Sequence, residues 1–174
     1  MKHIYEDKIL NLLFNRPMFK FHIRKLSKET GLDTKTVMGY LRKFIKEDIV
    51  IRRKERHHHP YYEANRLSRI YKCKKSNFMI ENITKSGLIE YLEEKIHPEL
   101  IILFGSMQKG TYHRRSDIDL FIKADKIKID LSKFEKRLGH KINLFFEKDF
   151  KKLSKGLLQN IYNGYVFSGS IEVS

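Results

Sequence analysis

The residues of this chain best suited to chemistry are two aspartates in the segment Ser116-Asp117-Ile118-Asp119-Leu120. Successive side chains of a β-strand point to opposite faces, so Asp117 and Asp119 would share one face of a strand. Two neighbouring carboxylates repel each other, and a divalent cation bound between them is the usual reason for such a pair. The spacing therefore predicts a divalent metal site at the start of a strand.

A Gly-Ser turn precedes the aspartates along the chain. Gly105-Ser106 follows the apolar run 100–104 directly. Such a turn offers backbone N–H groups and a hydroxyl to a phosphate that is carried on the cation. The turn and the carboxylate pair together predict phosphoryl-transfer chemistry.

The segments around these residues predict the elements that position them. Four apolar segments are predicted strands, namely 100–104, 117–122, 141–146 and 165–167. Three segments have helical periodicity, namely 80–96, 131–138 and 148–162. His97-Pro98 is expected to end the first of these helices. Before them, a basic amphipathic connector over 66–78 is expected to start as a helix and to end near Ser76-Asn77.

The net charge of +15 is concentrated in the first half of the chain. Residues 1–78 contain 20 Lys or Arg and 8 Asp or Glu, whereas residues 79–174 contain 16 and 13. A charge needed only for solubility would be spread more evenly, so we rank that interpretation second. The local excess is typical of a nucleic-acid-binding module.

The same basic half has the pattern of three helices and a hairpin. The helices are predicted at 4–15, 22–30 and 33–47. Gly31-Leu32 would make the turn before the third helix, and Asp33 or Thr34 would cap it. The buried stripe of that helix is expected to be Val37, Leu41, Phe44 and Ile45. Strands are predicted at 49–53 and 61–64, on either side of a basic turn.

This pattern, over about residues 4–65, resembles the winged helix-turn-helix family. The resemblance implies binding of double-stranded DNA, with helix 33–47 in the major groove and the wing on the phosphates. Other winged helices bind proteins instead, but the basic charge favours DNA. Because winged helices commonly bind paired half-sites, a homodimer is also expected. The residues expected to contact DNA are Lys35, Thr36, Arg42, Lys43, Arg52, Arg53, Lys54 and Arg56.

Three adjacent histidines, His57-His58-His59, lie in the basic turn. Neighbouring residues of an extended wing point in alternating directions, so the three rings would not converge on one metal ion. No Cys or carboxylate cluster lies nearby in the sequence to complete a tetrahedral site. We therefore expect these side chains to contact phosphate, more strongly as the pH falls and the imidazoles gain charge.

Composition favours a small cytoplasmic protein. With 174 residues, 41% of them hydrophobic, the chain suits one large domain or two small ones. No apolar run approaches the roughly 18 residues of a membrane span. The first residues are charged where a signal peptide is apolar, which argues against secretion. Cys73 is the only cysteine, which excludes an internal disulfide and fits a reducing compartment.

Gly105-Ser106, Gly110 and the segment Ser116-Asp117-Ile118-Asp119-Leu120 together resemble the polymerase-β-type nucleotidyltransferase superfamily. The closest resemblance is to its minimal MNT domains, which are often paired with HEPN proteins in prokaryotes. It spans about residues 80–170 and implies a mixed sheet backed by helices. It also implies binding of ATP or another nucleoside triphosphate with Mg²⁺ or Mn²⁺, transfer of a nucleotidyl group to an acceptor, and an antitoxin-like partnership with a HEPN protein.

The expected architecture is therefore α+β. A winged helix-turn-helix would occupy residues 1–65, a basic helical linker 66–79, and a nucleotidyltransferase-like domain 80–174. Asp117 and Asp119 would be catalytic and hold the cations. Lys109, where the family often carries Arg, would neutralise triphosphate charge without the bidentate fork of a guanidinium. The nucleotide-binding set is Gly105, Ser106, Lys109 and Ser116, the last of which would orient the Asp117 turn.

One position departs from the family. In active members a later strand supplies a third carboxylate, which joins the metal cluster and can act as general base. Asn143 occupies that position here; its amide oxygen coordinates Mg²⁺ weakly, and the amide takes up no proton at neutral pH. Glu147 lies four residues further on, at the end of the strand. Two functions stay open: a transferase that adenylylates an acceptor, and a catalytically weak or inactive regulator that binds nucleotide.

Overall fold

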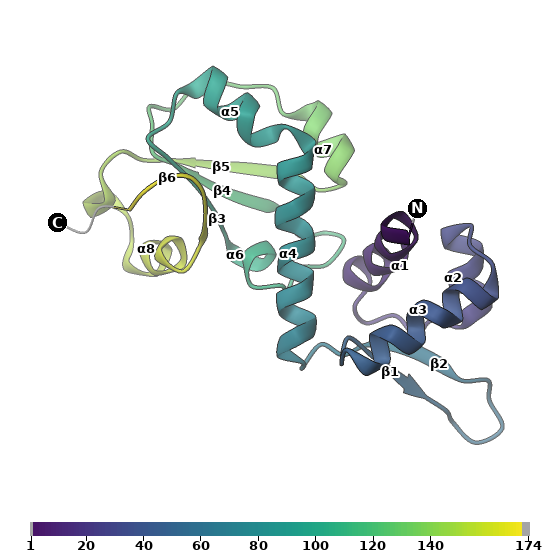
Figure 1. Cartoon of the computed structure of the whole chain (residues 1–174). Coiled ribbons are helices and arrows are strands. Elements are labelled where there is room, and N and C mark those ends of the chain that lie inside the picture. Colours follow the sequence, from purple (N-terminus) through teal and green to yellow (C-terminus); the bar gives the residue numbers. More distant parts are fainter. Residues whose placement is uncertain (1, 172–174) are drawn as a thin grey trace. The chain divides into compact units, whose positions relative to one another are not determined.

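The structure is a computed structural model that describes residues 2–171, with side chains described from residue 4 onward. Figure 1 shows helices and a small hairpin in the first part of the chain, followed by a four-stranded sheet with helices. The predicted α+β class is confirmed. The chain divides into two compact units, residues 1–75 and 76–174. Within the described residues no helix combines the length and the apolar character that a membrane crossing requires.

The first unit contains three helices, α1 (Lys2–Asn15), α2 (Ile23–Thr30) and α3 (Thr34–Lys46). Gly31 ends α2 in the left-handed conformation, with φ of 69°. Asp33 caps α3, because its carboxylate accepts a hydrogen bond from the Thr36 N–H at 2.8 Å. The third helix buries Val37, Leu41 and Phe44 as predicted. Ile45 is 37% exposed instead, since it lies about 100° around the helix from Phe44 and at the margin of the buried stripe.

A hairpin completes this unit. Strands β1 (Val50–Arg53) and β2 (Tyr61–Ala64) pair antiparallel, with Arg52 opposite Tyr62. Phe21, just before α2, exchanges two backbone hydrogen bonds of 2.8 Å with Tyr62. The hairpin is therefore attached to the chain that enters α2, and the two predicted strands are confirmed within a residue.

Two helices precede the sheet, and their boundary differs from the prediction. Helix α4 (Arg69–Ser86) continues through Ser76-Asn77, where the connector was expected to end. A serine within a helix can compete for its backbone, but the Ser76 hydroxyl donates to the Gln108 carbonyl at 2.6 Å instead. The break falls at Gly87 instead, whose φ is 77°, so the single helix predicted at 80–96 is wrong and α5 (Leu88–Ile96) begins after it.

The sheet of the second unit is mixed, with strand order β5-β4-β3-β6. All four predicted strands are present, as β3 (Leu100–Phe104), β4 (Ile118–Ile122), β5 (Ile142–Phe146) and β6 (Tyr165–Gly169). Strand β3 is antiparallel to β4 and β6, whereas β4 and β5 are parallel. Every residue of β3 is buried, so both faces of the sheet are covered at its centre. This central strand leads directly into the Gly-Ser segment.

The remaining helices are short. They are α6 (Gly105–Gln108), α7 (Ser132–Leu138), a 3₁₀ turn (Phe150–Lys152) and α8 (Lys155–Tyr162). The single helix predicted at 148–162 is wrong, because Leu153 is extended and interrupts it. Asp149 caps the 3₁₀ turn, and Ser154 begins α8 by accepting a hydrogen bond from the Leu157 N–H. Phe150 in the turn stacks on Phe121 of the sheet, which holds the interruption in place.

Candidate functional site

The strand register brings the predicted site residues together at one end of the sheet. Asp119 lies opposite Phe104 in the antiparallel pair β3–β4 and opposite Asn143 in the parallel pair β4–β5. Gly105 follows Phe104 directly and begins α6. Asp117, Asp119, Asn143 and Gly105 therefore meet at the point where β3 ends and β4 begins.

Asn143 binds both carboxylates. Its amide nitrogen donates to Asp119 Oδ1 at 3.0 Å and to Asp117 Oδ2 at 3.3 Å. Burial raises the pKa of the Asp119 carboxyl, the hydrogen bond from Asn143 works in the opposite direction, and the charge of Asp117 raises it again. The two carboxylates are thus partly removed from water and held close together, with one amide as their shared hydrogen-bond donor.

Gly105 is fitted closely against Asp119. It has a φ of 75°, which disfavours residues with a side chain, and an added Cβ would lie 2.8 Å from Asp119 Oδ2. The sequence predicted a turn here; the structure forms α6 instead, a single helical turn. The contact between Gly105 and Asp119 could not be predicted from local sequence, because it depends on the pairing of β3 with β4.

The nucleotide-binding candidates lie on two sides of this pair. Lys109 follows α6, and its ammonium donates to Asn160 Oδ1 of α8 at 2.9 Å. Asn160 was missed by the sequence analysis, which placed it inside a longer helix with no reason to single it out. Lys109 is therefore held beside α6 by an uncharged partner rather than by a carboxylate.

Ser116 shapes the turn before Asp117. Its hydroxyl accepts a hydrogen bond from the His113 N–H at 3.0 Å, and its carbonyl accepts one from Nδ1 of His140 at 2.7 Å. His140 is buried and packs edge-on against the buried ring of Tyr112. These contacts fix the backbone from which Asp117 projects. The sequence carried no signal for His140, whose partner is a backbone carbonyl distant in sequence.

The donor set suits one hard divalent cation bound through oxygen. The two carboxylates are ligands of the type that Mg²⁺ and Mn²⁺ take, whereas Asn143 turns its amide nitrogen rather than its oxygen toward them. The close approach of Gly105 to Asp119 leaves no room for a side chain on that flank of the carboxylate. A larger cluster is absent: within the described part of the chain, no three His, Cys, Asp or Glu residues are placed to hold a metal ion. The residues fit a divalent cation held by Asp117 and Asp119.

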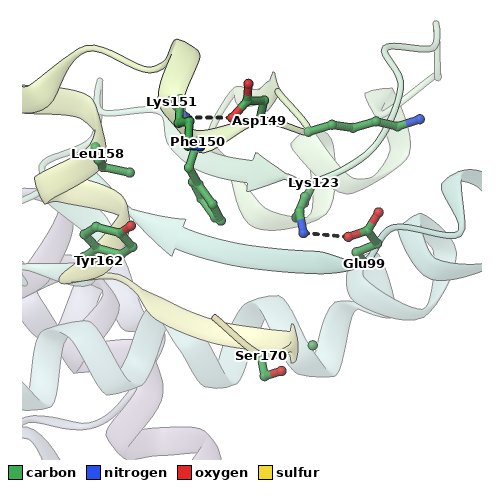
Figure 2. A pocket seen from close by; sticks show the side chains of 10 residues that line it. Glu99, Lys123, Asp149, Phe150, Lys151, Leu158, Tyr162 and Ser170 are labelled. Atoms are coloured by element: carbon green, nitrogen blue, oxygen red, sulfur yellow. Dashed lines mark hydrogen bonds and ion pairs between the residues drawn. The ribbon is translucent and has the colours of Figure 1, made fainter. Parts of the chain in front are cut away.

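A second pocket of about 560 Å³ lies at the opposite end of the sheet (Figure 2). Glu99 precedes β3 and Lys123 follows β4, and these two side chains form an ion pair of 2.6 Å. Lys148, which also lines the pocket, is paired with Asp125 at 2.5 Å. Figure 2 shows the rings of Phe150 and Tyr162 on another side of the pocket. Lys151 also lines the pocket and forms no ion pair with a described residue, so one of its three lysines has no carboxylate partner there.

In the first unit the predicted DNA-contacting residues fall into two groups. One group is exposed and forms no ion pair with any residue that the structure describes: Lys35, Arg42, Arg52, Lys54 and Arg56. The other group is engaged within the protein. Thr36 donates its hydroxyl to Asp33 at 2.6 Å, and Arg53 pairs with Glu63 at 3.1 Å.

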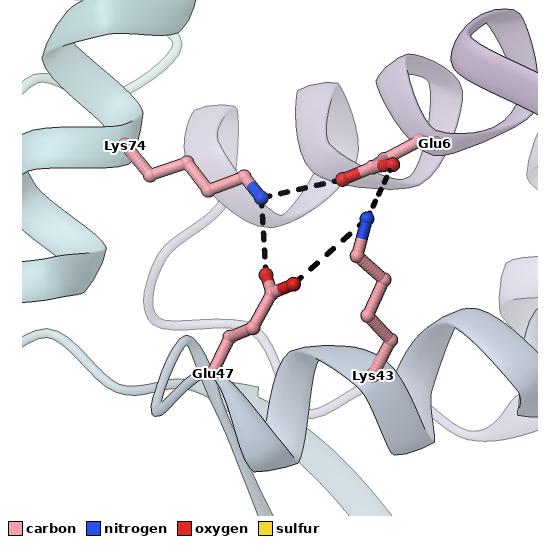
Figure 3. Close-up of polar contacts among 4 residues, drawn as sticks. All are labelled: Glu6, Lys43, Glu47 and Lys74. Carbon is pink, nitrogen blue, oxygen red and sulfur yellow. Dashed lines mark hydrogen bonds and ion pairs between the residues drawn. The ribbon is translucent and has the colours of Figure 1, made fainter.

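Lys43 belongs to this second group. Figure 3 shows it in a four-membered network with Glu6 of α1, Glu47 after α3 and Lys74 of α4. Lys43 lies 2.8 Å from Glu6, and Lys74 lies 3.3 Å from Glu6 and 3.0 Å from Glu47. Burial alone would raise the pKa of Glu6, but the hydrogen bonds and charges of the two lysines lower it below its ordinary value. This network joins three helices of the unit.

Comparison with known families identifies one part of the chain. Residues 86–167 match the family described as polymerase beta, nucleotidyltransferase. The chain therefore contains a nucleotidyltransferase domain of the polymerase-β type, which confirms the resemblance drawn from Gly105 to Leu120. No curated protein and no solved structure gave a significant match. The winged helix-turn-helix resemblance stays a prediction.

Proposed function

We propose that the chain binds a nucleoside triphosphate with Mg²⁺ at Asp117 and Asp119 and transfers a nucleotidyl group, AMP when the substrate is ATP, to an acceptor. The observation that carries the proposal is the carboxylate pair held against Gly105 inside a nucleotidyltransferase domain. In the same proposal, the basic first unit binds double-stranded DNA and directs the domain to its place of work.

The chain supplies a binding group for each part of the substrate. Asp117 and Asp119 hold the cation, which when bound neutralises charge on the phosphate oxygens during transfer. The backbone N–H groups at the start of α6, the Ser106 hydroxyl and the Lys109 ammonium are the donors for the β- and γ-phosphates. The hydrogen bond from Lys109 to Asn160 limits the motion of that ammonium and so favours binding in one place.

A second candidate function rests on Asn143. The amide stands where a third carboxylate would act as general base, and it donates hydrogen bonds to both aspartates. An amide cannot accept the proton of an acceptor hydroxyl at neutral pH. This observation favours a DNA-binding regulator that binds nucleotide and cation with little or no turnover.

One experiment distinguishes the transferase from the nucleotide-binding regulator. The protein is incubated with α-³²P-labelled ATP and Mg²⁺ or Mn²⁺, alone, with nucleic acid and with an extract of its host, next to an Asp117→Ala/Asp119→Ala control. Binding of ATP is measured in parallel by titration. Cation-dependent label transfer that the control lacks supports the transferase. ATP binding without transfer supports the regulator, and absence of cation-dependent ATP binding contradicts both.

A further inference from the structure

A hollow of about 430 Å³ borders Asp117 on the side away from α6. We call it the Arg114–Lys141 hollow, after the cations that line it: Arg114, Arg115 and Lys141. Asp117, Glu135 and His140 also line it. It therefore combines one of the proposed catalytic carboxylates with three positive side chains.

The three cations of this hollow are not neutralised within the protein. Arg114, Arg115 and Lys141 are exposed, and none forms an ion pair with a described residue. The two acids of the hollow accept hydrogen bonds from uncharged donors, Glu135 from the Ile142 N–H at 2.9 Å and Asp117 from Asn143, so the three cations outnumber the two carboxylates. This differs from the pocket at the other end of the sheet, where two lysines are paired with carboxylates. The hollow thus offers unused positive charge.

The backbone that carries the two arginines is held in place. The Arg115 N–H donates to His113 Nδ1 at 3.1 Å, and the His113 N–H donates to the Ser116 hydroxyl at 3.0 Å. The buried His140 holds the Ser116 carbonyl. The guanidinium groups therefore extend from a fixed turn next to Asp117, and less entropy is lost when they bind a ligand.

The order of the strands separates this hollow from the triphosphate donors. Helix α6 and Lys109 follow β3, whereas the hollow is formed where β4 and β5 begin, and β4 lies between β3 and β5. A nucleotide whose phosphates lie on α6 and Lys109 leaves the β5 side of Asp117 accessible. This side is therefore available for the second reactant of a transfer reaction.

We propose that the Arg114–Lys141 hollow binds the acceptor, and that the acceptor carries a phosphate group next to the hydroxyl that is modified. The inference rests on the proposed transferase function and names its substrate class. Arginine and lysine without acidic partners are the side chains that bind phosphate, and Arg does so with two parallel hydrogen bonds.

The reaction at this hollow needs no reactant besides ATP and the acceptor. The acceptor hydroxyl oxygen forms a bond to the α-phosphorus of ATP, and the bond from that phosphorus to the oxygen bridging to the β-phosphate breaks. Pyrophosphate leaves with that oxygen, and the hydroxyl proton passes to water, since Asn143 cannot accept it. The phosphate on the acceptor is not consumed; it only positions the hydroxyl.

Two probes represent the two kinds of acceptor that carry such a phosphate. A uridine trinucleotide with a free 3′-hydroxyl represents the end of a nucleic-acid strand, and ribose 5-phosphate represents a small sugar phosphate. Affinity for each probe is measured by titration in the presence of Mg²⁺ and a non-hydrolysable ATP analogue. The test variant is Arg114→Gln/Arg115→Gln/Lys141→Gln. The matched control, Lys126→Gln/Lys128→Gln/Lys155→Gln, removes the same charge from exposed lysines elsewhere in the unit. Affinity for the ATP analogue is measured for all proteins.

The expected result is a loss of about tenfold or more in probe affinity for the hollow variant only, with a shallower salt dependence and unchanged affinity for the ATP analogue. Binding of the trinucleotide alone identifies a strand end as acceptor, and binding of ribose 5-phosphate alone identifies a small sugar phosphate.

Equal losses of probe affinity in both variants, or no loss in either, overturn the inference. Loss of ATP-analogue binding in the hollow variant overturns it too, while leaving the proposed function standing. Failure of the unaltered protein to bind the ATP analogue contradicts the proposed function itself and this inference with it. Lys141→Glu is a second variant, with the same expected result, in case the triple variant does not fold.

Discussion

Asn143 lies directly opposite Asp119 in the parallel pair of β4 and β5, and its amide nitrogen donates to Asp119 Oδ1 at 3.0 Å. The amide supplies hydrogen bonds at a place where a third negative charge would repel the first two. The Asp117–Asp119 pair is thus stabilised by the protein itself, before any cation binds. This gives the residue a measurable effect on both stability and metal affinity.

Replacing Asn143 with Asp should make the site depend on a cation. With the cation chelated, we expect the free energy of unfolding to fall by about 1–2 kcal/mol, because three carboxylates then lie together. With Mg²⁺ or Mn²⁺ present, affinity for the cation should rise about tenfold, and label transfer should rise with it. Thermal unfolding with EDTA and with Mg²⁺ measures the first effect. Asn163→Asp is the control: it removes a hydrogen bond to the Gln159 carbonyl at the end of α8, so any loss of stability should be the same with EDTA and with Mg²⁺.

Gly105→Ala should damage the site more than an ordinary glycine substitution does. Gly105 and Gly139 have similar φ values, 75° and 74°, but an added Cβ meets Asp119 at 2.8 Å only at position 105. Gly139→Ala should therefore cost only the backbone strain, roughly 1–2 kcal/mol. Gly105→Ala should cost more and also weaken Mg²⁺–ATP binding. Equal unfolding free energies and equal ATP affinities for the two variants would contradict the role of this close approach.

Arg42 and Lys43 are neighbours on α3 but should behave differently. Arg42→Gln should leave thermal stability unchanged, weaken binding to duplex DNA and lower the slope of affinity against salt by about one. Lys43→Gln should lower stability by up to about 1 kcal/mol, because it removes the partner of Glu6 and Glu47 from a network that is partly exposed to solvent. Duplex binding that survives Arg42→Gln unchanged would move the DNA contact away from this helix face.

Lys75 should make stability depend on pH. It is buried next to Tyr71, whose hydroxyl lies 3.4 Å from its ammonium, and burial lowers the pKa of Lys75 from 10.5 to about 7. Between these values the unfolded chain binds one more proton than the folded chain. The free energy of unfolding should therefore rise with pH above about 7, by at most about 1.4 kcal/mol per pH unit. Chemical denaturation at several pH values measures this rise.

The control for this effect is a pair of variants. Lys75→Met should remove the rise in stability and increase the unfolding free energy at pH 7, since a buried ammonium is replaced by an apolar side chain of similar length. Lys72→Met, on a less buried lysine of the same helix, should keep the rise. A pH profile of Lys75→Met that matches the unaltered protein would assign the effect to another group.

Helices and strands that depend only on residues close together in the sequence could be predicted from it. The apolar run 100–104 predicted β3, because a strand buried on both faces is continuously apolar. The alternation from Asp117 to Leu120 predicted the start of β4. Gly31 and Asp33 gave the start of α3, since a left-handed glycine and a capping carboxylate act within a few residues. The place of Asn143 beside the aspartates was implied by the family resemblance instead.

Features that depend on tertiary partners were not predictable. Ser76 was expected to end a helix, but its hydroxyl binds a carbonyl distant in sequence. The break at Leu153 depends on Phe150 stacking on a strand. Lys43 looked like a free cation on a basic helix face, because its partner Glu6 lies on another helix. In each case a contact made only by the folded chain decides what the residue does.

The register that sets Asn143 beside Asp119 also has a genetic consequence. The codons for asparagine and aspartate differ only in their first base, so one A-to-G transition at codon 143 adds the missing carboxylate. The backbone already places residue 143 correctly, and no second substitution is needed to bring the new side chain to the site. A single mutational step would therefore place a third carboxylate beside Asp119 without any change to the register of the sheet.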